Sequence, residues 1–284
     1  GAIFVLLFFY SNWLMFSAFR TFIFATPKMK EVLSEQIIMS FQKVKERIAQ
    51  DILGLSQGSY LDNQRSILRF EAPCPRVNCL DWLDAQVSQI KVYWANRDNS
   101  FQVAGIGKAD KVQGTAIDTY AAPFNAISKK LSADNAIRYY GGMDFYPSKV
   151  NKDISGKRRA AREWKAFGAY CFLLPRFEIV KRQGKYFFVC NIVTQDVTKS
   201  LIKEYLRFLD EISFSLNSPT LFIPKIKSLS MSPNNENWQR LFREHIQPSG
   251  KMVYQKIVLA QKTAIELASK VSPLTVFKKL IQQQ

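Results

Sequence analysis

This chain has little histidine, and its cysteines do not form two pairs at the spacing of a zinc site. Its 284 residues contain one histidine, His245, and four cysteines. Cys74 and Cys79 have no second pair at zinc-ribbon spacing, so a structural zinc site is not expected. Cys171 and Cys190 lie in apolar, strand-like segments, which is typical of small core residues in a reducing compartment. His245 lies on an apolar helical face, where a packed histidine is more common than a catalytic one.

The sequence also lacks a dinucleotide-binding motif. Gly105 and Gly107 form only Gly-x-Gly, without the third glycine and the following helix that a Rossmann site needs. We expect these glycines to mark a bulge or a close approach between backbones. No internal repeat or low-complexity tract is present.

Acidic residues are outnumbered by basic ones, 23 against 40, which gives a net charge of +17. Such a charge suits an anionic partner: nucleic acid, a membrane surface or a small acid. The densest basic cluster, residues 157–165, is interpreted as the solvated face of a helix. No nucleic-acid-binding motif accompanies it, so nucleic acid is not an expected partner. With 47% hydrophobic and 22% charged residues, the chain is typical of a globular protein with one large or two small domains.

The first 19 residues carry no charge and are almost long enough to span a bilayer as a helix. Arg20, Lys28 and Lys30 follow, as they would on a cytoplasmic flank. A basic n-region and a clear cleavage site are missing, which argues against a signal peptide. Two hypotheses stay open: a membrane anchor within residues 1–26, or translation upstream of a start at Met29. We expect a cytoplasmic protein, with membrane association as the alternative.

Hydrophobic periodicity and turn residues predict a mixed order of helices and strands. A hairpin is expected from strands at 169–180 and 185–193, with Gln183-Gly184 as its turn and Pro175 marking an edge or a bulge. Hairpins outnumber βαβ units, which favours the α+β class. Helices are expected at 31–53, 80–86, 118–131, 199–214, 237–246 and 271–284, and further strands at 66–70, 91–94, 101–107 and 137–140.

Four segments follow from this order. They are a hydrophobic segment at 1–28, an α+β region at 29–216, a Pro-, Ser- and Asn-rich linker or surface loop at 217–237, and a last region at 238–284.

Lys256 is the candidate catalytic residue. It precedes Ile257–Ala260, a short apolar run that is typical of a strand buried on both faces. A lysine at the mouth of such a strand loses part of its hydration, which lowers its pKa towards the range where the amine can accept a proton. Lys256 is therefore a candidate general base. The alternative is a lysine that extends to solvent from a strand end.

The amphipathic helix that opens with Asn237-Trp238, followed by the Lys256-Ile-Val-Leu-Ala strand, resembles the chorismate-utilising enzymes and, within them, the isochorismate synthases. Pro248 interrupts what is usually a continuous helix, and Gln261 stands where the family mostly has Arg. Further motifs of the family occur in its order at Leu80–Gln86, Val92–Arg97, Val103–Gly107, Gly141–Phe145 and Phe172–Arg176.

The resemblance covers about residues 60–284 and implies an α+β fold of the anthranilate synthase component I type. That fold has large antiparallel sheets with covering helices, and only its N-terminal portion is expected here. The implied reaction converts chorismate to isochorismate: Lys256 deprotonates a water that attacks C2, a glutamic acid protonates the departing C4 hydroxyl, and Mg²⁺ holds the carboxylate. The acid and the metal ligands are expected beyond Gln284, so that no metal-binding or cofactor-binding residue is assigned here and this chain is expected to be a fragment.

Several alternatives remain open. Anthranilate synthases resemble one another in having Gln at the lysine position, so Lys256 favours water over ammonia as the nucleophile. Salicylate synthase shares the lysine. A menaquinone role is expected, with siderophore or salicylate biosynthesis as alternatives. Outside the enzyme class, the chain could be a non-catalytic remnant or a basic membrane-associated binding protein. The oligomeric state cannot be predicted.

Overall fold

The computed structural model describes residues 27–57, 67–117, 119–131, 136–144, 166–194, 197–214, 222–246 and 260–282. For residues 27–39, 57, 245 and 246 it describes the backbone alone. The chain divides into two compact units, Gly1–Pro219 (unit 1) and Thr220–Gln284 (unit 2).

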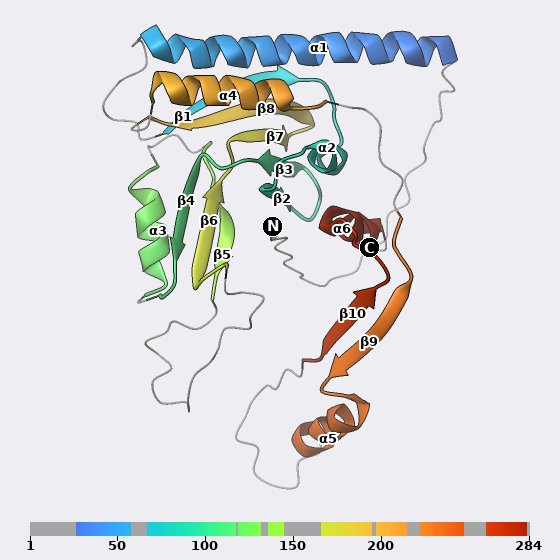
Figure 1. Cartoon of the computed structure of the whole chain (residues 1–284). Coiled ribbons are helices and arrows are strands. Elements are labelled where there is room, and N and C mark those ends of the chain that lie inside the picture. The colour runs from blue at the N-terminus through green and yellow to red at the C-terminus, as the bar shows by residue number, and fades with distance from the viewer. Residues whose placement is uncertain are drawn as a thin grey trace. The chain divides into compact units, whose positions relative to one another are not determined.

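Unit 1 contains helices packed on antiparallel sheets (Figure 1). Its elements in chain order are α1 (Pro27–Gly54), the short 3₁₀ helix η1 (Leu55–Gln57), β1 (Ile67–Cys74), α2 (Cys79–Ala85), β2 (Lys91–Ala95), β3 (Phe101–Ile106), β4 (Asp110–Gly114), α3 (Ala121–Ser128), β5 (Tyr140–Met143), β6 (Tyr170–Leu174), β7 (Phe177–Arg182), β8 (Lys185–Val193) and α4 (Lys199–Glu211).

Two sheets organise unit 1. The larger has five strands in the order β1-β8-β7-β3-β2, and the smaller has three in the order β4-β6-β5. Every neighbouring pair is antiparallel. Helices α1 and α4 lie together over β1 and β8, and α3 lies beside β4 (Figure 1). The predicted α+β class, with antiparallel sheets and covering helices, is confirmed.

The core between α1 and the large sheet is hydrophobic and aromatic. Phe214, which follows α4, stacks on Phe41 with ring centroids 4.3 Å apart and meets Phe188 of β8 edge-on at 5.3 Å. These three rings stabilise the packing of α1 on the five-stranded sheet, because each ring buries a large apolar area. The buried α1 side chains recur at helical spacing, as the sequence predicts: Phe41, Val44, Ile48 and Ile52.

The predicted hairpin is present as β7 and β8. Gln183 and Gly184 both have positive φ, 49° and 75°, which matches the twist of a two-residue hairpin turn. The preceding segment, however, is not one strand with a bulge. It is divided at Pro175, so that β6 belongs to the three-stranded sheet and β7 to the five-stranded sheet. Proline has no N–H to donate to a ladder, and the chain changes sheets at that point.

Gly105 allows a close approach of the Pro175 ring, a side chain rather than the backbone that the sequence led us to expect, and no bulge occurs in β3. A Cβ at this position would lie 2.5 Å from the Pro175 Cγ. We predict that Gly105→Ala lowers the free energy of unfolding by about 1–3 kcal/mol, because the ring must be displaced in a packed region. Urea denaturation measures it. Gly184→Asn is the matched control, since nothing lies within 4 Å and asparagine tolerates positive φ. An equally stable Gly105→Ala variant would contradict the packing.

The segment 217–237, predicted to be a linker or a surface loop, contains regular structure in its described part. Strand β9 (Ile226–Ser232) lies there, and α5 (Asn235–Ile246) begins there. Leu229 and Met231 alternate with serines, which is a strand period that the proline and serine content concealed. Thus the linker prediction was wrong for residues 226–232.

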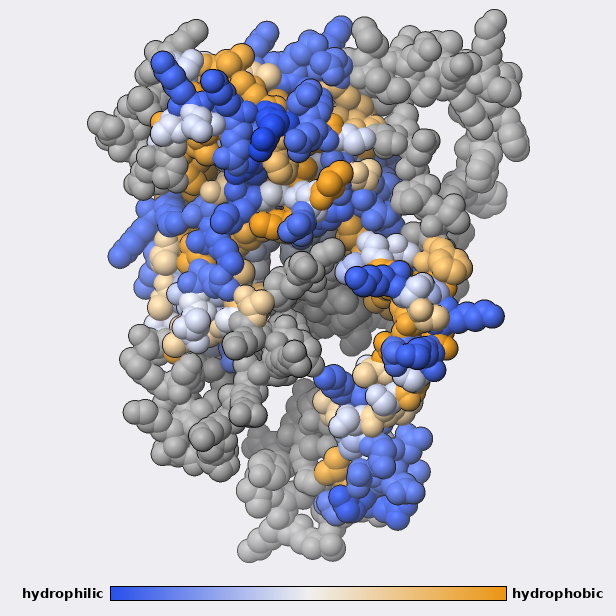
Figure 2. Space-filling view, in the orientation of Figure 1, coloured by the Kyte–Doolittle hydropathy of each residue, from blue (hydrophilic) through white to orange (hydrophobic). Residues whose placement is uncertain are grey.

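Unit 2 consists of β9, α5, β10 (Lys262–Leu267) and α6 (Pro273–Gln282). β9 and β10 pair as an antiparallel two-stranded sheet, in which Leu229 faces Ile265. Hydrophilic residues predominate on the surface of α5 (Figure 2).

Several other expectations meet the structure only in part. The strand predicted at 137–140 begins later, as β5 at Tyr140. Cys190 is fully buried, as predicted, whereas Cys171 is half-buried. The basic segment 157–165 lies outside the described residues. Among the helices of the described ranges, none is long and apolar enough to cross a membrane. Residues 1–26, the possible anchor, lie outside the described ranges.

Candidate functional site

Lys256, the predicted base, lies outside the described residues, as does most of its expected strand 257–260. Ala260 is described and lies outside any strand, and β10 begins only at Lys262. Helix α5, which precedes this segment, begins after Asn234, whose side chain accepts the backbone N–H of Asn237 at 3.0 Å. The His245 side chain is likewise not described. The role of Lys256 therefore stays a prediction from the sequence.

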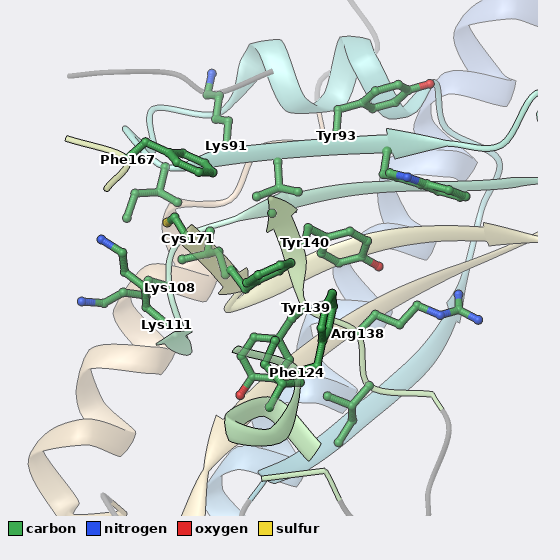
Figure 3. A pocket seen from close by; sticks show the side chains of 18 of the residues that line it. Lys91, Tyr93, Lys108, Lys111, Phe124, Arg138, Tyr139, Tyr140, Phe167 and Cys171 are labelled. Carbon is green, nitrogen blue, oxygen red and sulfur yellow. The ribbon is translucent and has the colours of Figure 1, made fainter. Parts of the chain in front are cut away.

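Unit 1 contains a cavity of about 940 Å³ (Figure 3). Its walls come from β2, the start of β3, β4, β5, β6 and α3, together with the segments that join them. The three-stranded sheet therefore supplies one part of the wall, and β2, at the end of the five-stranded sheet, supplies another.

Aromatic rings form much of the wall, and we call this space the aromatic cavity. Trp94 and Phe101 meet edge-on with ring centroids 5.7 Å apart, and Phe124 and Phe172 are tilted at the same separation. Phe124 is 51% exposed and Trp94 is 42% exposed, so both rings have surface available to a bound molecule. The aromatic lining residues include Tyr93, Trp94, Phe101, Phe124, Tyr140 and Phe172.

Among the described residues that line the aromatic cavity, the charged ones are basic: Lys91, Lys108, Lys111 and Arg138. Lys108 and Lys111, here called the lysine pair, extend in the same direction at one side (Figure 3). Within the described part of the chain, neither forms an ion pair with a carboxylate. The Lys91 ammonium donates to the Asp84 carbonyl at 3.2 Å. The Arg138 guanidinium lies 4.3 Å from the centre of the Phe101 ring.

The Asp110 carboxylate, beside Lys111 in sequence, is already neutralised by other groups. It accepts hydrogen bonds from the Lys130 ammonium at 2.6 Å and from the Tyr139 hydroxyl at 2.5 Å. Burial opposes the charge of Asp110, but these bonds outweigh burial and hold its pKa below the usual value. Burial and the Asp110 charge raise the pKa of Tyr139. Asp110 is therefore paired with Lys130 and Tyr139 rather than with its neighbour Lys111.

A buried polar cluster lies in the large sheet. Glu178 is 1% exposed, and its Oε1 accepts hydrogen bonds from Asn191 Nδ2 at 2.5 Å and from Arg69 Nη1 at 3.5 Å. Asn191 also accepts from Arg69 Nη1 and donates to the Pro175 carbonyl. Burial raises the pKa of Glu178, opposed by the charge of Arg69 and the bond from Asn191. Burial, followed by the Glu178 charge, raises the pKa of Tyr140 in the cavity wall.

The raised pKa of Glu178 makes stability depend on pH. The folded protein keeps the Glu178 carboxyl protonated at pH values above its ordinary pKa of 4.5, whereas the unfolded chain does not. The free energy of unfolding should therefore fall as the pH rises from 4.5 through the raised pKa. We predict that Glu178→Gln removes that part of the slope, since glutamine accepts the same bonds without titrating. Urea denaturation at several pH values measures it, with Glu211→Gln on the surface as the control. An unchanged slope in Glu178→Gln would contradict a titrating buried carboxyl.

The described lining of the aromatic cavity contains one thiol, that of Cys171. Burial raises the pKa of the Cys171 thiol, so the nucleophilic thiolate is disfavoured. No group of three or more His, Cys, Asp or Glu side chains that could hold a metal ion occurs among the described residues.

Sequence reasoning missed this cavity, although the motifs that carry the family resemblance line it. The segment 92–97 contributes Tyr93 and Trp94, and the segment 172–176 contributes Phe172. Their aromatic content was a usable signal. Their convergence was not, because it depends on which strands share an edge.

Residues 54–284 match the family model described as chorismate binding enzyme. A search of curated proteins finds no match. Among solved structures, the chain resembles MenF, the menaquinone-specific isochorismate synthase from Escherichia coli, with a TM-score of 0.60 and 17% sequence identity.

The structural match covers 82% of this chain and 47% of the MenF chain. The chain thus spans about half the length of that protein, and it has the corresponding part of its fold. The family model matches well over half of the chain. This chain therefore belongs to the chorismate binding enzyme family.

Proposed function

We propose that the full-length protein carrying this chain is an isochorismate synthase. The observation that carries the proposal is the match of the family model over residues 54–284, a range that includes Lys256 and its apolar strand sequence. Lysine at this position favours water as the nucleophile, because water must lose a proton when it attacks and ammonia can attack without a base.

In the proposed reaction the neutral Lys256 amine takes a proton from a water molecule while the oxygen of that water bonds to C2 of chorismate. The ring double bond shifts, and the C4 hydroxyl leaves as water after it receives a proton from an acid. Product and substrate are isomers, so no redox partner is needed. Mg²⁺ is the proposed cofactor, and the described residues contain no group of three or more His, Cys, Asp or Glu side chains that could hold it.

A product assay tests the reaction type. Incubation of the full-length protein with chorismate and Mg²⁺ should yield isochorismate, identified by chromatography and mass spectrometry. Salicylate with pyruvate would instead indicate a salicylate synthase. Anthranilate formed when ammonia is added would contradict water as the nucleophile. Unchanged chorismate in every condition would contradict the enzyme assignment and favour a binding remnant.

We further propose that the isochorismate feeds menaquinone biosynthesis. The support for this branch is that MenF, whose fold the chain shares in part, is a menaquinone-specific enzyme. Deleting the gene should then lower the menaquinone content of the cell, and supplied isochorismate should restore it. Normal menaquinone in the deletion strain would contradict the branch.

A further inference from the structure

We draw no further inference here: the strongest candidate, the aromatic cavity of unit 1, is lined by segments that continue in sequence into residues 132–135 and 145–165, which lie outside the described ranges, so nothing in the structure shows what covers it.

Discussion

Replacing Lys256 by alanine should lower the kcat for isochorismate formation by about 10²–10⁴-fold, the usual contribution of a general base. The attacking water is a poor nucleophile until its proton is removed, and alanine offers no group that can accept it. The KM for chorismate should change much less, because the amine acts on water rather than on the substrate. Steady-state kinetics of the full-length protein with chorismate and Mg²⁺ measure both constants.

The control for this prediction is Lys270→Ala, an exposed lysine in the same unit, which should leave kcat unchanged. Equal heat stability of the two variants would show that the effect is chemical. If Lys256→Ala turned over chorismate at the parent rate, the base would have to be another group, and the interpretation of the apolar strand would fail with it.

The second large effect is structural. Glu178→Ala should lower the free energy of unfolding of unit 1 by about 3–5 kcal/mol, the range found when one partner of a buried ion pair is removed. Arg69 and Asn191 would lose the Glu178 oxygen that accepts from both of them. The Arg69 side chain is only 8% exposed, so water can replace that acceptor only in part.

Urea denaturation followed by far-ultraviolet circular dichroism measures the change. Glu211→Ala at the exposed end of α4 is the matched control and should shift stability by no more than about 0.5 kcal/mol. A Glu178→Ala protein as stable as the control would mean that Arg69 finds full compensation elsewhere. Glu71, 3.6 Å from Arg69 Nε, is the candidate for that role.

Local patterns predicted the elements of this fold well where one face of an element is buried. The α1 side chains from Phe41 to Ile52 repeat at helical spacing, and the hairpin turn at Gln183-Gly184 has the residue types that its positive φ angles require. The pattern failed where tertiary context decides. Pro175 interrupts a strand in either interpretation, but only the pairing partners show that the chain passes there from one sheet to another.

Composition misled at 217–237 for a related reason. Pro224 and Pro233 flank strand β9 rather than interrupt it, and serine occupies alternate positions of the strand. The aromatic cavity could not be predicted at all, because Tyr93, Phe124 and Phe172 come from separate elements that meet only in the folded chain. The candidate base Lys256, in contrast, was predicted from the sequence alone, and its proposed role still rests on the sequence.

The origin of the new oxygen tests the proposed chemistry most directly. The full-length protein is incubated with chorismate and Mg²⁺ in water enriched in oxygen-18, and the isochorismate is analysed by mass spectrometry. Water activated by Lys256 must leave a labelled oxygen on C2, so we predict that the C2 hydroxyl carries the isotope fraction of the solvent. Isochorismate with an unlabelled C2 hydroxyl would show that the hydroxyl moves within the substrate, and the role proposed for Lys256 would be wrong.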